Sequence, residues 1–240
     1  MRIIARLDIK NNYVIKGINF EGLRKIGSPT ELCSKYYKDG ADELVLFDSV
    51  ASLYSRDNIF EIIKKITENV FIPVCIGGGI RSLEDIKMAL YSGADKVLIN
   101  TAIVKNISFL KEAKQNFGAS NIVVSIEAKK SDNSWEVYTN SGRDKTNIDV
   151  FDWVQKVQDI GCGEIILTSI DHDGTRQGLD LNLIKKIKEI KVDVPLIFSG
   201  GIGKIEHVKE LKNIFPDEAL AVASALHYNN LKISQIKKIA

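Results

Sequence analysis

The sequence predicts an α/β protein, a (β/α)8 TIM barrel built from two duplicated half-barrels. Short apolar runs alternate with amphipathic helical stretches along all 240 residues, and eight such runs are present. Continuous apolar strands separated by helices are typical of parallel strands covered by helices, and eight of them favour closure into a barrel. The second observation is an internal repeat at half the chain length. A doubly wound open sheet is the alternative fold.

The strands are expected at the apolar runs, which span 2–8, 43–48, 72–77, 96–100, 122–127, 164–169, 194–200 and 219–224. The helices are expected where apolar residues recur at helical spacing, over 29–39, 57–68, 82–92, 108–117, 149–160, 180–190, 204–214 and 231–239. After the fifth strand, the alternation in "WEVYTNSGR" (135–143) predicts a small hairpin. Since no linker-like stretch divides the chain, we expect a single domain over 1–240.

The repeat is visible in two pairs of segments. "GADELVLFDS" (40–49) matches "GCGEIILTSI" (161–170), and "IPVCIGGGIRS" (72–82) matches "VPLIFSGGIGK" (194–204). A duplicated half-barrel explains this best, because it places equivalent segments on opposite sides of one barrel. It also pairs Asp8, at the end of the first strand, with Glu127, at the end of the fifth.

Composition excludes several classes of function. The chain is 45% apolar and 27% charged with a net charge of +2, and no lysine cluster is interleaved with aromatics, which argues against nucleic acid. The three cysteines and three histidines lack metal-ligand spacing, so we expect no disulfide, metal or cofactor. Charges near the N-terminus interrupt any signal-peptide core, and no apolar run reaches membrane-spanning length. These features predict a cytoplasmic protein.

Two glycine turns predict anion sites. Gly77-Gly78-Gly79 leads into a helix capped by Ser82, and Gly200-Gly201-Ile202-Gly203 repeats the arrangement in the second half. Glycines let backbone N–H groups approach an anion closely, so two such turns at half-barrel spacing would hold a substrate with a phosphate at each end. Small and polar neighbours follow the adjacent strands, at Asn100, Thr101, Ala223 and Ser224. Ordinary tight turns are the alternative interpretation.

Carboxylates follow several strands, at the barrel end where catalytic groups are usually found. Asp8, Asp48 and Glu127 end the first, second and fifth strands. Each could cap a helix or anchor a loop, but Asp8 and Glu127 facing each other across the mouth are better explained as a general acid/base pair. Thr168, Asp173 and Gly174 add polar groups to the same rim.

The opposite ends of the strands carry four charges, at Arg2, Glu43, Lys96 and Glu164. A salt-bridge ring that closes the barrel floor is one interpretation, since features on that face usually serve stability. The alternative is a gate that admits a small neutral molecule into the bore. Physical reasoning from the residues alone favours the plain ring.

The chain resembles the HisF family, the cyclase subunits of imidazole glycerol phosphate synthase. The segments that carry the resemblance are "LDIKNNYVIKGINFEGLR", "GADELVLFD", "IGGGIRS", "GADKVLIN", "WEVYTNSGR", "GCGEIILTSIDHDGT" and "SGGIGK". The resemblance extends from Arg2 to about Tyr228. It implies a subunit that takes ammonia from a HisH glutaminase and acts on a bisphosphorylated ribulosyl aminoimidazole compound.

Residue roles follow from the resemblance by position. Asp8 is similar to the first catalytic aspartate, and Lys16 and Asn19 fall in the mobile first loop. One phosphate site would comprise Gly79, Asn100 and Thr101, and the other Asp173, Gly174, Gly201, Ala223 and Ser224. The four floor charges match a gate for ammonia, which reverses the preference for a plain ring.

Two residues depart from the family pattern. Glu127 stands where the family motif A-I-D-A-K has its second aspartate, and Arg6 replaces a small residue two places before Asp8. Strand alternation points Arg6 into the bore, so we expect it to pair with Glu127 and to lower the pKa of that carboxyl.

The departures favour a HisF-like paralogue that delivers ammonia to a sugar amidotransferase for surface polysaccharide. Three alternatives stay open. They are the authentic cyclase of histidine biosynthesis, a non-catalytic scaffold that activates a glutaminase, and a HisA-like isomerase, which would not need the charged floor.

Overall fold

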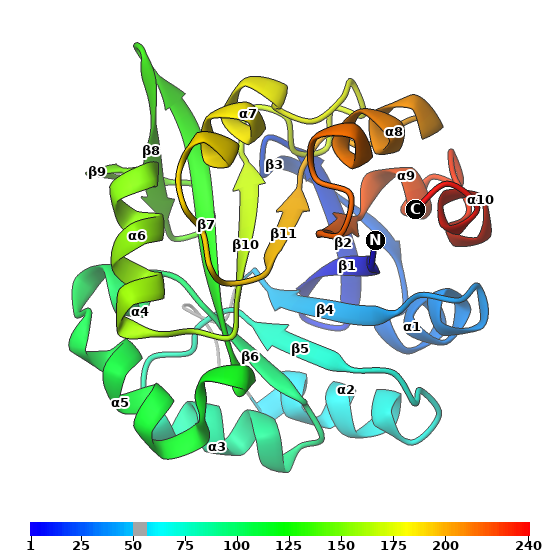
Figure 1. The fold of residues 1–240 in the computed structure, drawn as a ribbon. Helices are drawn as coiled ribbons and strands as arrows, with labels where there is room; N and C mark the ends of the chain where they lie inside the picture. The colour runs from blue at the N-terminus through cyan, green and yellow to red at the C-terminus, as the bar shows by residue number, and fades with distance from the viewer. Residues whose placement is uncertain (50–56) are drawn as a thin grey trace.

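Eight parallel strands form a closed barrel in this computed structural model, which describes residues 1–49 and 57–240 (Figure 1). The strands are β1 (Ile3–Lys10), β4 (Glu43–Asp48), β5 (Val74–Gly77), β6 (Lys96–Ile99), β7 (Ile122–Ser131), β10 (Glu164–Ser169), β11 (Leu196–Ser199) and β12 (Ala219–Val222). Each pairs with its neighbours in chain order, and β12 returns to pair with β1. The predicted (β/α)8 barrel is confirmed, and each strand begins in its predicted run, although β1 and β7 continue beyond theirs into the hairpins.

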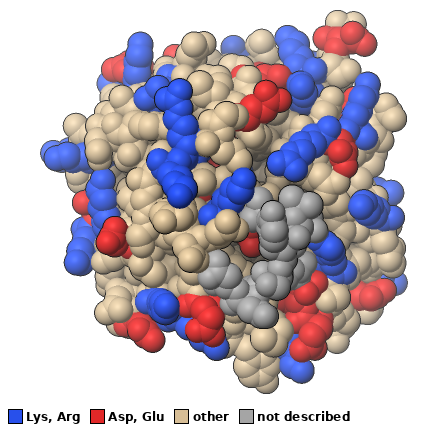
Figure 2. Space-filling view, turned by 180° about the vertical axis from the view of Figure 1, so that it is seen from behind, with Lys and Arg blue, Asp and Glu red and all other residues tan. Residues whose placement is uncertain are grey.

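Helices cover the outside of the barrel (Figure 1). They are α1 (Pro29–Lys38), α2 (Asp57–Thr67), α3 (Leu83–Tyr91), α5 (Ser108–Phe117), α6 (Val150–Ile160), α7 (Leu181–Glu189), α8 (Ile205–Ile214) and α10 (Ile233–Lys237). Each buries an apolar stripe, as in α7, where Leu183, Ile184 and Ile187 face the core. Figure 2 shows Lys and Arg mixed with Asp and Glu on one face, as expected for solvated outer helix faces.

Two short helices were not predicted, and they repeat between the halves. The helices α4 (Thr101–Lys105) and α9 (Ser224–His227) each begin directly after a strand end, and a short 3-10 helix spans Ala119–Asn121. The residue before α4, Asn100, has φ −131° and ψ −86°, and the residue before α9, Ala223, has φ −124° and ψ −84°. The unusual backbone is thus nearly identical in the two halves, which supports the duplication read from the repeat.

Two hairpins extend the first strand of each half above the barrel. The strands β8 (Ser134–Thr139) and β9 (Asp144–Asp149) extend β7, as predicted, and β2 (Tyr13–Ile18) and β3 (Glu21–Gly27) extend β1. The sequence predicts only a loop around Lys16 and Asn19. The segment forms the partly buried strand β2 instead, and Asn19 and Phe20 turn the chain with φ of 52° and 64°.

The barrel interior holds a separate apolar layer. Its members are Ile4, Val45, Cys75, Leu98, Val123, Ile166, Ile197, Ala219 and Ala221, with Phe47 packed against them. Because side chains alternate along a strand, Arg6 and Asp8 point to the same side of β1 as Ile4. Within residues 1–49 and 57–240, no helix is long and apolar enough to cross a membrane.

Candidate functional site

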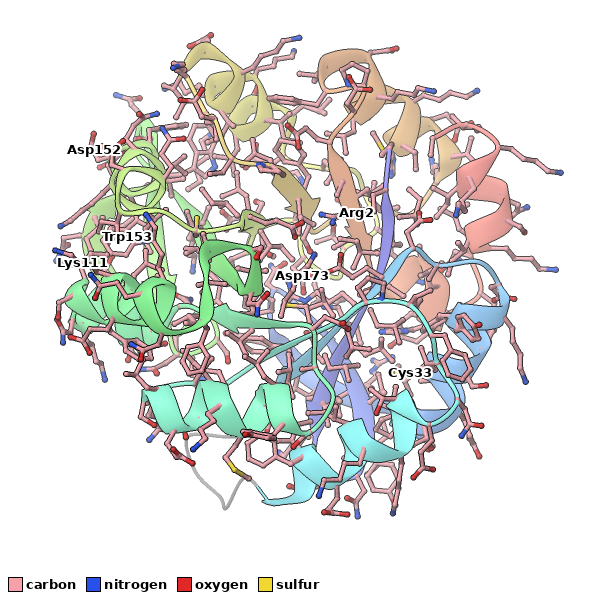
Figure 3. All side chains as sticks on the ribbon, turned by 60° about the horizontal axis from the view of Figure 1, so that its bottom comes forward. Arg2, Cys33, Lys111, Asp152, Trp153 and Asp173 are labelled. Atoms are coloured by element: carbon pink, nitrogen blue, oxygen red, sulfur yellow. The ribbon has the colours of Figure 1, made fainter. Side chains whose placement is uncertain are left out.

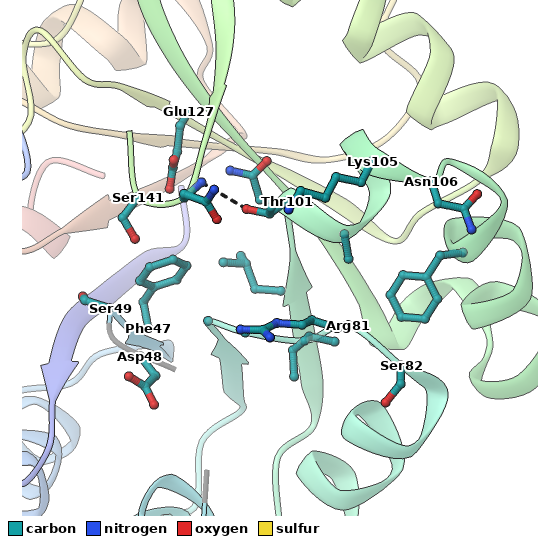
Figure 4. A pocket seen from close by; sticks show the side chains of 18 of the residues that line it. Phe47, Asp48, Ser49, Arg81, Ser82, Thr101, Lys105, Asn106, Glu127 and Ser141 are labelled. Atoms are coloured by element: carbon teal, nitrogen blue, oxygen red, sulfur yellow. Dashed lines mark hydrogen bonds between the residues drawn. The ribbon is translucent and has the colours of Figure 1, made fainter. Parts of the chain in front are cut away.

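The carboxyl ends of the strands enclose a pocket of about 690 Å³ (Figure 4). It brings together five residues that sequence analysis selected, namely Asp48, Gly79, Asn100, Thr101 and Glu127. The Thr101 hydroxyl accepts a hydrogen bond from the Asn140 N–H at 3.1 Å, which ties the pocket to the β8–β9 hairpin. The first predicted phosphate group and the Glu127 carboxyl therefore share one cavity.

The glycine turn at this pocket needs its glycines. Gly78 and Gly79 have φ of 93° and 65°, a region that other residues rarely adopt. A Cβ atom on Gly78 would lie 2.1 Å from the main-chain oxygen of Asp48. Asp48 thus borders the turn through its backbone as well as lining the pocket.

A second, much smaller pocket of about 10 Å³ lies at the equivalent place in the other half. Its lining includes the five residues predicted for the other phosphate, which are Asp173, Gly174, Gly201, Ala223 and Ser224. The Ser224 hydroxyl and the Asn100 side-chain oxygen are buried without a hydrogen-bond partner among the described residues. Buried polar atoms are normally satisfied, so these two atoms, one in each half, are suited to receive a ligand.

Asp8 lies in a buried network of ion pairs rather than opposite a free carboxyl. Its side chain accepts from Arg6 Nε at 3.0 Å and from Lys16 Nζ at 2.9 Å. Lys16 also donates to Asp173 at 2.7 Å, and the Asn19 N–H donates to the Asp173 main-chain oxygen at 2.8 Å. The β2–β3 hairpin is therefore anchored over the mouth through Lys16 and Asn19.

The predicted pair between Arg6 and Glu127 is wrong. Arg6 pairs with Asp8, and its Nη1 donates to Thr168 Oγ1 at 3.0 Å and to Ser199 Oγ at 3.4 Å. Thr168, predicted as part of the rim, is fully buried and anchors Arg6. The physical reason is proximity, because Asp8 extends from the same face of the same strand two residues away, whereas Glu127 lies on β7.

The pKa values of the Asp8 and Glu127 carboxyl groups are shifted in opposite directions. Burial alone would raise the pKa of Asp8, but the charges of Arg6 and Lys16 overcome it and lower that pKa far below its ordinary value. Burial raises the pKa of Glu127 to about 7, against the opposing effects of the Arg6 charge and the Gly142 N–H. The predicted lowering for Glu127 is therefore wrong. Of the two, Glu127 has the pKa near neutral pH.

The main chain of the β8–β9 hairpin holds Glu127 in place. The Gly142 N–H donates to Glu127 Oε2 at 2.8 Å, and Glu127 is 2% exposed. Figure 4 shows its carboxyl directed into the pocket, near Ser141 and Phe47. This is the arrangement expected of a general acid/base group whose proton faces a bound molecule.

The four charges at the floor form a closed ring. Arg2 Nη1 lies 3.1 Å from Glu43 Oε2 and 2.8 Å from Glu164 Oε1, and Lys96 Nζ lies 3.0 Å and 3.1 Å from the same two atoms. In Figure 3, Arg2 lies near the centre of the ring of strands, whereas Lys111 and Asp152 lie on outer helices. The predicted juxtaposition is confirmed, and burial raises the pKa of Glu43.

Sequence analysis missed several residues that line the main pocket. Arg81, Lys105 and Arg143 bring positive charge to it, and Phe47 forms part of its wall (Figure 4). Arg81 follows the triple glycine directly and Arg143 ends the hairpin motif, so a cation beside each loop motif was the available signal. Among the described residues, no group of three or more His, Cys, Asp or Glu side chains is arranged to hold a metal ion.

The fold and site together define a class of barrel enzyme with duplicated halves, two glycine turns at the mouth and a charged ring at the floor. Comparison with known proteins identifies the family. A family model described as "Histidine biosynthesis protein" matches residues 2–232. The chain belongs to this family, and within it to the HisF group of enzyme subunits.

Three relatives are named imidazole glycerol phosphate synthase subunit HisF. The protein from Legionella pneumophila is 52% identical over 207 residues, which is 86% of this chain and 97% of that protein. The protein from Sulfurisphaera tokodaii is 46% identical over 237 residues, covering 99% and 94%. The protein from Pyrococcus furiosus is 43% identical over 236 residues, covering 98% and 93%.

Proposed function

We propose that this chain is the ammonia-accepting subunit of a two-subunit glutamine amidotransferase, and that it is a divergent paralogue serving amidation of a sugar for surface polysaccharide. A HisH-like glutaminase would dock at the floor, and a cytoplasmic sugar amidotransferase would be the further partner. The main observation behind this proposal is that Arg6 replaces a small residue in the bore and pairs with Asp8. This pair removes one of the two carboxyls expected to exchange protons in the cyclase.

The closed floor ring supports the ammonia route. Two cations and two carboxylates meet within 3.1 Å at the entrance to an apolar bore. An isomerase that uses no ammonia would gain nothing from buried ion pairs that open on a bore, since such pairs are costly to bury and contribute little net stability. A HisA-like isomerase is therefore disfavoured.

The mouth supports a phosphorylated substrate. Gly79, Asn100 and Thr101 line one pocket, and Gly201 and Ser224 line its counterpart in the other half. Glycine turns present main-chain N–H groups to anions, and Arg81 and Lys105 add charge beside the first turn. Glu127 would act as the acid/base group next to it. These features favour an enzyme over a purely structural activator of a glutaminase.

A second candidate is the authentic cyclase of histidine biosynthesis. The relatives' names and the two retained anion pockets favour it. In this case Glu127 alone would supply the proton transfers that two aspartates supply in the family pattern. The two candidates differ in whether the Arg6–Asp8 pair is compatible with cyclase chemistry.

Complementation of a histidine auxotroph that lacks its HisF subunit tests the proposal. We expect no growth with the parent chain, and restored growth with Arg6→Cys combined with Glu127→Asp, which returns both positions to the family pattern. Equal amounts of folded protein, measured by immunoblot and thermal unfolding, are the control. Robust growth with the parent chain would reject the paralogue in favour of the cyclase.

A further inference from the structure

Arg6 lies directly in the path between the floor and the mouth. Along the inward face of β1, Arg2 belongs to the floor ring, Ile4 to the inner apolar layer and Asp8 to the mouth. Arg6 lies between Ile4 and Asp8 and is 5% exposed. Any molecule that enters at the floor and reacts at the mouth must pass the level of this guanidinium.

The guanidinium spans the bore rather than lying along its wall. It starts on β1 and reaches Thr168 on β10, which is three strands away around the barrel, and Ser199 on β11. On its other side, the rings of Phe20 and Phe47 lie with their centres 5.7 Å from the guanidinium carbon. Contacts thus surround Arg6 on several sides at one level of the bore.

The charge of Arg6 is held there firmly. Asp8, which accepts its Nε–H, is itself held by Lys16, and Lys16 by Asp173. Displacing a buried guanidinium without another carboxylate partner is costly. The group that could receive it is Glu127, which lines the same narrow pocket as Arg6 and Asp8. Arg6 is therefore paired with one carboxylate, Asp8, and a second carboxylate, Glu127, lines the same pocket.

We propose that Arg6 is a plug that closes the bore below the mouth, and that ammonia reaches the reaction site only when Arg6 is displaced from Thr168 and Ser199. A positive guanidinium also repels the ammonium ion, so neutral ammonia is the species that would pass. The identity of the cargo rests on the proposed function. The closure itself rests only on the contacts of Arg6.

Cys75 provides a reporter for this closure that needs no substrate. It belongs to the inner apolar layer beneath Arg6, whereas Cys33 and Cys162 lie in the outer core between strands and helices. All three thiols are buried, and burial raises the pKa of each, so all three react slowly while the barrel is closed. Opening the bore exposes Cys75 alone, whereas unfolding exposes all three.

The experiment measures the rate at which methyl methanethiosulfonate, a small neutral reagent, labels each cysteine, with the peptides separated by mass spectrometry. For Arg6→Ala we expect labelling of Cys75 to rise at least tenfold, with Cys33 and Cys162 unchanged. Thr168→Val with Ser199→Ala, which removes two anchors but keeps Arg6, should give a smaller rise. Arg24→Ala, at an exposed position on β3, is the matched control and should change nothing.

If Cys75 is labelled in Arg6→Ala at a rate within twofold of that in the parent chain, whether both rates are fast or both slow, Arg6 does not close the bore. If Arg6→Ala exposes all three thiols together, it has unfolded, and Arg6→Met, which keeps the bulk of the stem, replaces it under the same criterion. Selective exposure of Cys75 without any glutamine-dependent amination would keep the plug and reject only the proposed function.

Discussion

Arg6 Nε lies 3.0 Å from Asp8 Oδ1, between two side chains that leave the same face of β1 two residues apart. This pair lowers the pKa of Asp8 far below its ordinary value, whereas burial raises the pKa of Glu127 to about 7. Lys16 completes the arrangement from the β2–β3 hairpin.

Replacing Arg6 with Met should destabilise the protein by about 3 kcal/mol, because it leaves a buried carboxylate with one cation instead of two. The Asp8→Asn exchange alone should also destabilise. The double variant should lose clearly less than the sum of the two, since the second change removes a charge already left underpaired. Urea unfolding of all four proteins measures this. Additive losses would show that the two residues are not energetically coupled.

Glu127 should make stability depend on pH. A carboxyl whose pKa is raised by folding stabilises the folded state below its unfolded value of 4.5, and this contribution is lost as pH rises through about 7. The parent chain should therefore lose on the order of 3 kcal/mol relative to Glu127→Gln between pH 4.5 and pH 8. Denaturant titrations at both pH values give the difference. A constant difference would mean that Glu127 is ionised throughout.

Glu127→Gln should also reduce turnover with ammonium salts by a factor of about 10² to 10⁴, the usual loss when a general acid/base is removed. The parent chain should show an inflection in kcat near pH 7 that the variant lacks. Glu136→Gln, on the neighbouring strand β8, is the comparison. Unchanged kcat in the Glu127 variant would exclude it from proton transfer.

The floor ring should matter only when ammonia comes from a glutaminase. Lys96→Met breaks two of the four ring contacts and leaves the mouth untouched. We expect glutamine-driven amination to fall at least tenfold while ammonium-driven amination stays within twofold. Lys87→Met, on the exposed face of α3, should change neither. Equal losses with both nitrogen sources would assign the ring to stability alone.

Gly201→Ala should weaken anion binding at the second pocket, because its Cβ would lie 1.9 Å from the Gly178 main-chain oxygen. Gly118→Ala is the matched control, since Gly118 also has positive φ, 83°, but nothing lies within 4 Å of its Cβ position. Inorganic phosphate, followed by ³¹P line broadening, is the probe. We expect binding in the parent and in the control, at least tenfold tighter than in Gly201→Ala. Equal phosphate binding by the parent chain, Gly118→Ala and Gly201→Ala would show that the second pocket is not a phosphate site.

The barrel and the places of the candidate site residues at the strand ends could be predicted from the sequence because both follow from local patterns. Apolar strands and amphipathic helices indicated the order of elements, the strand starts indicated the floor charges, and the repeat paired the two glycine turns. The short helices α4 and α9 were missed because four or five residues carry no periodicity.

The ion-pair partner of Arg6 could not be predicted from local patterns. Alternation gave its direction correctly, but the choice between Asp8 and Glu127 depends on reach within the barrel and on Lys16 arriving from the hairpin. The predicted direction of the Glu127 pKa shift was wrong for the same reason. Burial without a direct cation partner raises the pKa of a carboxyl group, whereas an ion pair lowers it.

The contacts of Arg6 also bear on how this molecule can be divided. A duplicated barrel suggests an origin as a pair of identical halves. Here Arg6 and Lys16 come from the first half, and Thr168, Asp173 and Ser199 from the second. Two copies of the first half would leave Asp8 as the partner of both cations, without the contacts that the second half supplies, so the two halves have become complementary parts of one network.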